Sequence, residues 1–377
     1  MTNHQRSGLP TKGTWPLDDQ LIRLRVFGTE QTYDLVPGPA VQIIGSSSGC
    51  DIVLGKRDGT VAARHARLTR RQSRWTIHAI DEGAGSVCRD RVALREFPLI
   101  PGLEIGIGQV MLIAESQRSL VLHRALARLL GFGAAQRAYV DRALGTVLTT
   151  ASGRSALMLY GEGDLMYVAR QLHRLALDDR PFVVSDPRRL RGEGDARSAR
   201  NIDDPMAAFT AAAGGSLCFA ARRLPDGFER MVERWRRSEA RVQLILCDRA
   251  ADPVLVTAAD SIILPPMSVR GRDRLRIIAE IAGDAAAELG VDASSFTGTD
   301  RRRVLESDAA TLPDIERAIH RIIALRHWGV TPASRKLGMS HGALFEWAVR
   351  RGVVPGSSRS GRYRDRSRHK PRAIRRG

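Results

Sequence analysis

Between Leu21 and about Ser116 the chain alternates short apolar runs with turn residues. Runs such as LIRLRVF, VQIIG, HARLTR and RWTIHAI have the length and the period-two alternation typical of β-strands, and Gly, Pro, Asp and Ser recur between them. The pattern predicts an all-β sandwich over residues 21–116. Residues 1–20 are polar with Gly and Pro and are expected to form a flexible leader.

After Gln117 the pattern changes to Ala, Leu and Arg at helical spacing, so a boundary is expected between residues 117 and 127. Over residues 127–266, runs such as ALMLYG, RPFVVSD and RVQLILCD alternate with helical stretches, which favours an α/β domain with a parallel sheet. Beyond that point only the helical period continues. It predicts an α-helical lid over residues 267–326 and a final α-helical unit over residues 327–355.

Composition adds a strong positive charge to this multidomain pattern. The 377 residues are 43% hydrophobic, and Lys+Arg number 59 against 41 Asp+Glu, a formal charge of +18. Such an excess favours a polyanion such as nucleic acid as partner. Residues 356–377 hold eight Arg and one Lys against one Asp and are expected to form a basic disordered tail. Only four lysines occur in the chain, and this preference for Arg is typical of high-GC coding.

The sequence predicts no metal site, disulfide or membrane span. Its four cysteines form no CxxC pair and are interpreted as isolated apolar residues in cores. No run of 18 apolar residues occurs, and the N-terminus has no apolar segment typical of a signal peptide. A cytoplasmic protein is therefore expected.

The predicted sandwich resembles a forkhead-associated (FHA) domain. The resemblance covers residues 21–116 and rests on Gly45, the DIVL strand at residues 51–54, His65-Ala66 and the Pro101-Gly102 turn, which come in the family order. It implies a β-sandwich that binds phosphothreonine peptides through loops at one end.

The phosphate-binding positions depart from the FHA pattern. Ser46 occupies the position of the family's Arg. The family's Ser-Arg pair, which lies two positions ahead of the His, is replaced by Ala62-Ala63. The family's Asn-Gly-Thr loop is replaced by Ala-Gly-Ser at residues 84–86. A phosphate needs charge-assisted donors, and these substitutions remove them. The candidate phosphopeptide residues are Ser46, Ser47, Arg64 and Ser86. His65 is expected to be structural, and we expect a protein-interaction module with little phosphothreonine selectivity.

From about Leu130 to Leu325 the chain is similar to the AAA+ domain of bacterial enhancer-binding proteins, the activators of sigma-54 RNA polymerase. The landmarks are Leu130-Gly131, LMLYGE at 157–162, VARQLH at 168–173, RPFV at 180–183, GGSL at 214–217 and LPP at 264–266. The resemblance implies an α/β body with a helical lid.

The parts of this family that bind and hydrolyse ATP are missing. Residues 161–167, GEGDLMY, lack the Lys and Ser/Thr of a phosphate-binding loop. The strand at residues 217–219 is followed by Ala220-Ala221 where the family has Asp-Glu, and no GAFTGA loop occurs between these motifs. Glu316, in the lid motif, would repel phosphate. We expect a domain that hydrolyses no ATP and binds no cofactor.

Residues 330–350 fit a helix-turn-helix template and resemble the Fis-type unit that ends enhancer-binding proteins. Gly338 forms the turn, Ser340 caps the second helix, and Leu344 and Trp347 anchor that helix to the core. Residues expected to contact DNA are Arg335, Lys336, Ser340, His341, Phe345, Arg350 and Arg351, with Arg359 and Arg362 in the tail. The alternative is a helical hairpin that only packs on the lid.

The first interpretation is a DNA-binding transcriptional regulator that carries an FHA-like protein-interaction domain and acts without ATPase activity. The second is a non-enzymatic scaffold in which the FHA-like and AAA+-like domains hold proteins and the basic tail contacts RNA or an acidic protein. Double-stranded DNA and a protein partner are the expected ligands. Because helix-turn-helix proteins commonly read two half-sites, the sequence is also compatible with a homodimer.

Overall fold

The computed structural model describes residues 20–36, 41–55, 59–71, 74–80, 87–89, 92–152, 155–187, 199–238, 240–249, 260–307 and 309–353. Its described residues divide into two compact units. Unit 1 contains those up to Ile277 together with Ala310–Pro313, and unit 2 contains those of Ile278–Ala309 and from Asp314 onward.

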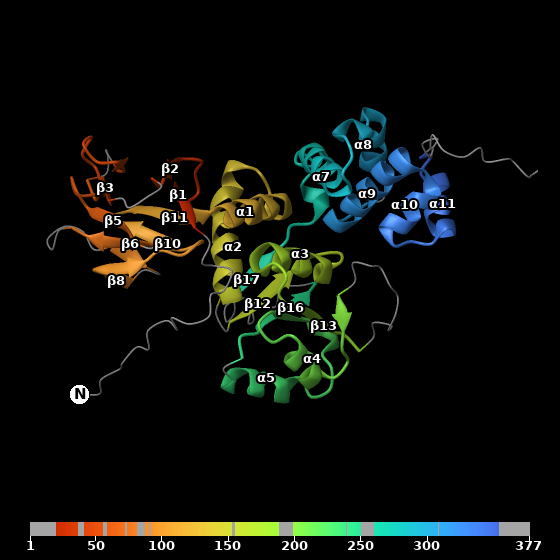
Figure 1. The fold of residues 1–377 in the computed structure, drawn as a ribbon, viewed down its shortest axis with the longest axis horizontal. Helices are drawn as coiled ribbons and strands as arrows, with labels where there is room; N and C mark the ends of the chain where they lie inside the picture. The colour runs from red at the N-terminus through yellow and green to blue at the C-terminus, as the bar shows by residue number, and fades with distance from the viewer. Residues whose placement is uncertain are drawn as a thin grey trace, which may run out of the picture. The chain divides into compact units, whose positions relative to one another are not determined.

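Unit 1 begins with a β-sandwich (Figure 1). One of its sheets has the order β2-β1-β11-β10-β7-β8 and the other β4-β3-β5-β6-β9. The strands are β1 (Leu21–Val26), β2 (Thr32–Asp34), β3 (Val41–Gly45), β4 (Ile52–Val53), β5 (Ala66–Arg71), β6 (Arg74–Ala79), β7 (Val87–Arg89), β8 (Val92–Leu94), β9 (Glu96–Pro98), β10 (Glu104–Ile107) and β11 (Val110–Ser116). The period-two pattern predicted this alternation, and residues such as Leu68, Trp75 and Ile77 fill the core between the sheets.

The last strand of the sandwich continues into helix α1 (Gln117–Leu130) without a linker. Ser116 ends β11 and is the N-cap of α1, where its side chain and that of Ser119 form a reciprocal capping box. Helix α2 (Ala134–Ser152) follows and packs against the next sheet, and α1 packs against α2 and joins the same core.

That sheet is parallel and has the order β14-β13-β15-β16-β12-β17. Its elements are β12 (Ala156–Tyr160), α3 (Leu165–Leu177), β13 (Phe182–Ser185), β14 (Arg200–Asn201), α4 (Pro205–Ala211), β15 (Ser216–Ala220), η2 (Ala221–Arg223), α5 (Phe228–Arg237), β16 (Gln243–Asp248), β17 (Asp260–Ile263) and η3 (Met267–Val269).

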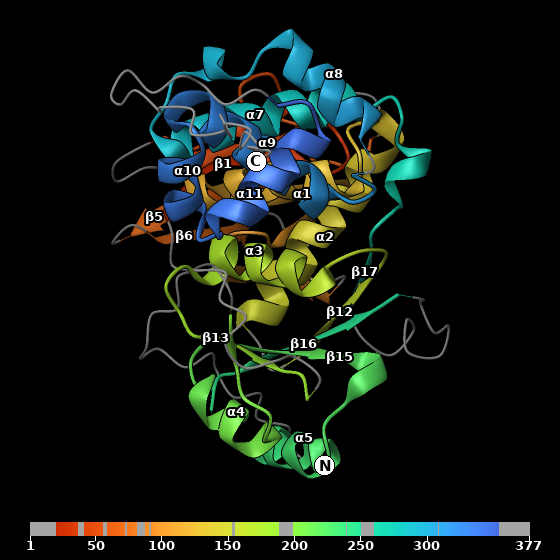
Figure 2. The same cartoon turned by 90° about the vertical axis from the view of Figure 1, so that its right-hand side faces the viewer.

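Both faces of this sheet are covered by helices. Helices α2 and α3 lie over one face, with α1 packed against them, and α4 and α5 lie over the other (Figure 2). Successive side chains of strand β15 point to opposite faces of the sheet. Cys218 packs in the core on the α2–α3 face, whereas Leu217 and Phe219 pack in the core on the α4–α5 face. This arrangement explains why the strands read as continuous apolar runs.

Unit 2 is helical, and α7 and α9 each begin in unit 1. Its elements are α7 (Arg274–Leu289), η4 (Ala293–Ser295), α8 (Gly298–Glu306), α9 (Leu312–Trp328), α10 (Val330–Leu337) and α11 (His341–Arg350). Thr297 is the N-cap of α8, and the buried carboxylate of Asp300 accepts from its backbone N–H. The same carboxylate accepts hydrogen bonds from Arg303 and Arg326, so it connects α8 to α9.

Candidate functional site

The FHA-like loops are held together by backbone contacts. Gly45 lies so close to the loop before β5 that a Cβ there would meet the carbonyl oxygen of Ala63 at 2.2 Å. This close approach lets the backbone N–H groups of Ser46 and Ser47 donate to the carbonyls of Ala62 and Ala63, at 3.0 and 3.2 Å. The glycine in the motif therefore serves loop packing.

His65 is buried and structural, as expected. Its Nδ1 accepts a 3.1 Å hydrogen bond from the N–H of Ala62, and only 1% of the residue is exposed. The backbone N–H of His65 donates to the carbonyl of Ile44, and the backbone carbonyl of His65 accepts from the N–H of Ile80. The ring therefore fixes the loop and is closed to a peptide.

The loops bring three of the predicted peptide-binding residues together. Ser46 is half-buried, whereas Ser47 and Arg64 are exposed. In the part of the chain that the structure describes, Arg64 has no ion-pair partner, so its guanidinium is available to a ligand. Ser86 lies outside the described residues.

The turn after β12 places the carboxylate of Asp164 at the N-terminus of α3. Gly161 and Gly163 have φ angles of 154° and 86°, which a side chain would strain. Asp164 is the N-cap of α3, and its carboxylate accepts from the N–H of Tyr167 at 3.1 Å. A helix N-terminus attracts anions, and here the protein's own carboxylate occupies the place that a phosphate would need.

A small pocket lies at the carboxyl ends of β12 and β17. It is lined by Leu129, Glu162, Val168, Leu264, Pro265, Pro266, Met267, Arg270 and residues 310–313. Its volume of about 30 Å³ leaves room for about two water molecules. The buried guanidinium of Arg270 donates to the carbonyls of Arg128 and Leu129, at 2.5 and 2.8 Å, and also pairs with Asp273.

Two arginines, Arg222 and Arg223, lie at the carboxyl end of β15, on the same edge of the sheet as this pocket. Arg222, which follows β15, donates to Asp248 at the end of β16 at 2.7 Å. Arg223 pairs with the buried Asp186 at 3.0 Å. The sequence showed the loss of the acidic pair at residues 220 and 221 but gave no sign that arginines would neutralise the acids on adjacent strands.

Two cysteines meet in the sheet, so the interpretation of all four as isolated residues is wrong for this pair. The Sγ atoms of Cys218 and Cys247 lie 3.8 Å apart on the neighbouring strands β15 and β16. Both are buried free thiols, and the hydrogen bond to Cys218, together with burial, raises the pKa of Cys247. The 29-residue separation hid the pair because adjacency follows from strand order.

In unit 2, α10 and α11 form a helix pair with the predicted turn chemistry. Gly338 follows α10 with a left-handed φ of 65°, and Ser340 is the N-cap of α11, accepting from the N–H of Ala343. Leu344 and Trp347 are buried beneath α11, as expected. The guanidinium carbons of Arg321 and Arg351 lie 5.3 and 5.1 Å from the Trp347 ring centroid.

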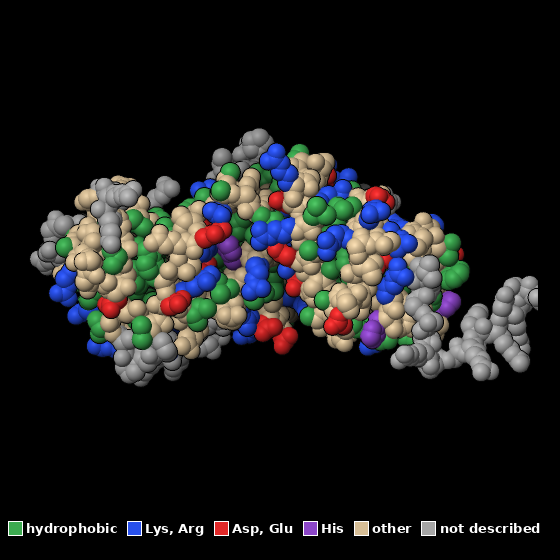
Figure 3. Space-filling model, turned by 90° about the horizontal axis from the view of Figure 1, so that it is seen from above, with side chains coloured by type: hydrophobic (Ala, Val, Ile, Leu, Met, Phe, Trp, Pro, Cys, Tyr) green, Lys and Arg blue, Asp and Glu red, His purple; other side chains and the backbone are tan. Residues whose placement is uncertain are grey.

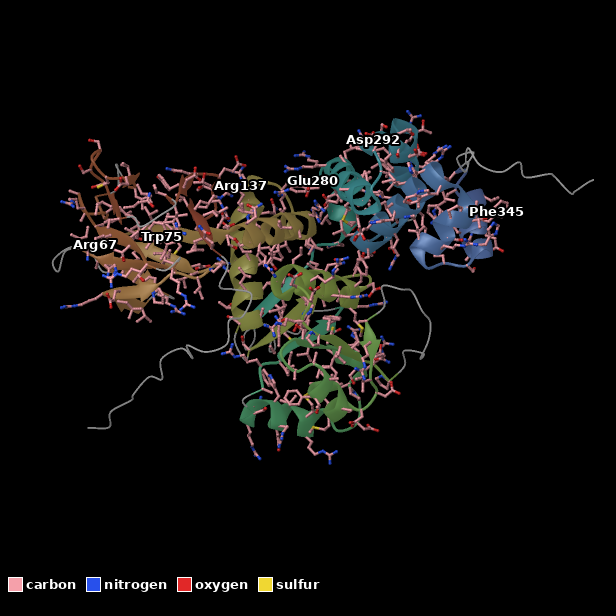
Figure 4. The ribbon with its side chains drawn as sticks, in the orientation of Figure 1. Arg67, Trp75, Arg137, Glu280, Asp292 and Phe345 are labelled. Atoms are coloured by element: carbon pink, nitrogen blue, oxygen red, sulfur yellow. The ribbon has the colours of Figure 1, made fainter. Side chains whose placement is uncertain are left out.

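The opposite side of α11 is exposed and has two rows at i, i+4 spacing. One row is His341, Phe345 and Val349, and the other is Gly342, Glu346 and Arg350; all six are exposed. The rings of His341 and Phe345 are stacked, with centroids 6.4 Å apart and an interplanar angle of 9°. Phe345 lies on the outer side of the ribbon in Figure 4. Val349 was not singled out from the sequence, although its position eight residues after His341 indicated it.

Basic side chains lie at the C-terminal ends of α10 and α11. Arg335 and Lys336 are exposed at the end of α10, and the Lys336 ammonium lies 4.4 Å from the Trp328 ring centroid. Arg351 is half-buried against Trp347. Figure 3 shows Lys and Arg side chains among hydrophobic and histidine side chains at the right-hand end of the described surface. Arg359 and Arg362, with the tail at residues 356–377, lie outside the described residues.

Comparison with known proteins identifies an FHA domain at residues 43–108. No curated protein sequence matches the chain. Similar solved structures include an FHA domain studied for phosphothreonine-dependent interactions, which is 20% identical, with a TM-score of 0.23 over 26% of this chain and 97% of that chain. Mycobacterium tuberculosis EmbR with a low-affinity phosphopeptide is 22% identical, with a TM-score of 0.23 over 25% of this chain and 24% of that chain. The FHA domain of a Chlamydia trachomatis protein is 19% identical, with a TM-score of 0.23 over 26% and 97%.

The N-terminal sandwich is therefore an FHA domain, and a mixed α/β region with helices follows it. Among the described residues, no helix is both long enough and apolar enough to cross a lipid bilayer.

Proposed function

We propose that this protein is a DNA-binding transcriptional regulator that resembles enhancer-binding proteins, lacks ATPase activity and receives a protein partner through its FHA domain. The observation that carries the proposal is the pair α10 and α11. Its second helix is anchored by Leu344 and Trp347 and exposes a full side between Ser340 and Arg350. A second helix of this kind is the element that helix-turn-helix proteins place in the major groove.

Charge supports a duplex as the ligand of this face. Arg335, Lys336 and Arg350 are exposed at its margins, where they can reach phosphates while the central residues face the bases. The tail at residues 356–377 adds eight Arg and one Lys against one Asp immediately after the unit. Phosphate contacts supply most of the sequence-independent affinity for DNA.

The α/β region acts in this proposal as a scaffold derived from an ATPase. The Asp164 carboxylate at the start of α3 repels phosphate from the helix terminus, and the pocket beside it has room for only about two waters. Arg222 and Arg223 neutralise Asp248 and Asp186 where a hydrolase would position metal and water. These contacts favour a domain that stabilises the chain without binding nucleotide.

Phosphopeptide-dependent protein interaction is the activity associated with the FHA family, and in this proposal the domain binds a protein partner. In this chain Arg64 is the exposed cation next to the Ser46–Ser47 loop and is the group best placed to contact a phosphate or an acidic side chain. The loss of the usual donor at Ser46 predicts weak selectivity for phosphothreonine.

Binding of the full-length chain to random-sequence duplexes over a range of salt concentrations tests the proposal. Removing residues 356–377 is expected to weaken binding to all sequences alike and to reduce the salt slope by roughly 0.9 per lost phosphate contact. Phe345→Ala is expected to reduce preference among sequences while leaving non-specific binding nearly unchanged. If tail removal abolishes all binding and Phe345→Ala has no effect, the helix pair only packs on the lid, and the protein-interaction scaffold replaces the regulator.

A further inference from the structure

The middle of the exposed side of α11 lacks the side chains that most often hydrogen-bond base edges. Between His341 and Val349 the chain contains no Arg, Lys, Asn or Gln. Bidentate contacts from Arg or Lys to guanine, and from Asn or Gln to adenine, are therefore unavailable over the middle of the helix. Of the polar side chains on this face, Glu346 can accept a hydrogen bond only from cytosine, and Arg350 lies at the end of the helix.

The exposed side of α11 presents the row formed by His341, Phe345 and Val349, in which Phe345 and Val349 are apolar. Phe345 is 49% exposed and Val349 is 61% exposed, one helical turn apart, and the His341 ring stacks on Phe345. The C5-methyl group of thymine is the apolar group that a base pair displays in the major groove. Apolar side chains are the groups that contact it favourably.

Gly342 provides an independent observation on the same face. It lies in the first turn of α11 with a helical backbone, and a Cβ built there would have no atom within 4 Å. Neither packing nor backbone geometry within the protein therefore requires glycine, although glycine destabilises a helix relative to alanine. The open space at Gly342 leaves room for another surface to approach the backbone of α11 closely.

We propose that Phe345 and Val349 read thymine methyl groups in the major groove, and that Gly342 lets the backbone of α11 approach the base edges. This inference rests on the proposed DNA binding and specifies its recognition chemistry. Arg335, Lys336 and Arg350 hold the helix in the groove through phosphates, so the apolar row discriminates between sequences while the cations supply affinity.

Replacing thymine by uracil tests the proposal, because uracil lacks the C5-methyl group and keeps the same hydrogen-bonding groups. The full-length chain is used to select duplexes from a random 20-base-pair library, and the selected pool is amplified with either dTTP or dUTP. The uracil pool is expected to bind at least about fourfold more weakly, which is the effect of losing one buried methyl contact. Equal binding of the two pools would overturn the proposal.

Phe345→Ala assigns the effect to α11. The variant is expected to bind the thymine pool more weakly than the wild type does and to show a smaller thymine-to-uracil difference, because only Val349 then contacts a methyl group. Leu275→Ala, which removes another exposed apolar side chain (54% exposed) on α7, is the matched control and should keep the full difference. A Phe345→Ala protein that still discriminates fully between the pools would contradict the assignment, and Val349→Ala provides a second variant.

Gly342→Ala separates groove approach from stability. Because alanine is the better helix former and meets no atom, the variant is expected to resist urea at least as well as the wild type. Its affinity for the selected duplexes should fall at least about fourfold. Undiminished affinity would refute the role of Gly342. If the wild type binds no duplex at all, the proposed function fails together with this inference, whereas duplex binding without a thymine effect removes only the inference.

Discussion

The guanidinium of Arg25 donates hydrogen bonds to both carboxylate oxygens of Asp141, at 2.9 and 2.7 Å. Arg25 lies on β1 of the FHA domain and Asp141 lies on α2, so this buried pair joins the sandwich to the helices that cover the α/β sheet. Arg25 also bonds Glu115, and Asp141 accepts from the N–H of Gly28 at 2.7 Å and contacts His123 at 3.0 Å. The FHA domain is thus fixed to the next domain by buried ions.

Asp141→Ala is expected to destabilise this junction strongly. The substitution leaves the charge of Arg25 buried beside Glu115 alone, and breaking a buried ion pair typically costs about 3–5 kcal/mol. Urea denaturation followed by tryptophan fluorescence measures the change. The control is Glu30→Gln, which removes the exposed ion pair of Glu30 with Arg137 and should cost less than about 1 kcal/mol. Arg137 is marked in Figure 4. Similar small losses for both variants would show that the junction contributes little.

Because of Asp141, the stability of the junction between the FHA domain and α2 is expected to fall in acid. Burial alone would raise the pKa of Asp141, but hydrogen bonds from His123, Arg25 and the N–H of Gly28 lower it below its ordinary value. A lowered pKa in the folded state contributes stability that is present above the unfolded-state pKa and is lost as pH falls through the folded value. Wild-type stability should therefore fall below about pH 4 more steeply than that of Asp141→Asn. Parallel curves for the two proteins would contradict this.

Nucleotide is expected to leave the melting temperature unchanged. A triphosphate at the start of α3 would meet the Asp164 carboxylate, and the neighbouring pocket of about 30 Å³ is too small to enclose it. Ligand at 100 times its dissociation constant would add about 2.7 kcal/mol of stability, which differential scanning fluorimetry detects easily. A saturable increase with Mg-ATP would refute the proposed loss of nucleotide binding.

The FHA domain is expected to prefer phosphothreonine peptides only weakly over their unphosphorylated forms. Ser46 replaces the usual arginine, and Arg64 is the exposed cation that remains beside this loop among the described residues. A peptide library measured by fluorescence polarisation on the full-length chain tests this. Arg64→Ala should remove the residual preference, whereas Arg67→Ala, an exposed arginine on β5 marked in Figure 4, should preserve it. Strong selectivity that survives Arg64→Ala would place the binding site elsewhere.

Local chemistry made much of this architecture predictable from the sequence. Period-two runs located the sandwich, and turn and cap residues such as Gly338 and Ser340 lie where the turn and the start of α11 were expected, because these signals act over only a few residues. Pairings between distant segments were not visible. Arg25 and Asp141 are 116 residues apart, and their meeting depends on how α2 packs on the sandwich. The different exposure of Phe345 and Trp347 was predicted, because helical spacing placed Trp347 with Leu344 on the core side and Phe345 on the other side.

Unit 2 is expected to lose stability as pH rises above the neutral range, through His320 on α9. Its Nε2 lies 3.0 Å from the Glu288 carboxylate on α7, and its Nδ1 lies 2.9 Å from the carbonyl of Glu316. Burial alone would lower the pKa of His320, but these acceptors outweigh burial and raise it above its ordinary value. A raised pKa in the folded state gives stability that is fully present below the unfolded-state pKa and disappears as pH increases through the folded value.

His320→Gln tests this link between α7 and α9. Glutamine retains hydrogen bonding but does not titrate, so the variant should lose on the order of 1 kcal/mol near pH 6 and much less near pH 9. Half of the Glu288 side chain is exposed, and solvent screening keeps the effect at this small size. Urea denaturation at both pH values measures it. The control His327→Gln changes an exposed histidine near the end of the same helix and should leave the pH dependence intact. If wild type and His320→Gln have the same pH dependence, the titrating link between α7 and α9 must be sought in another group.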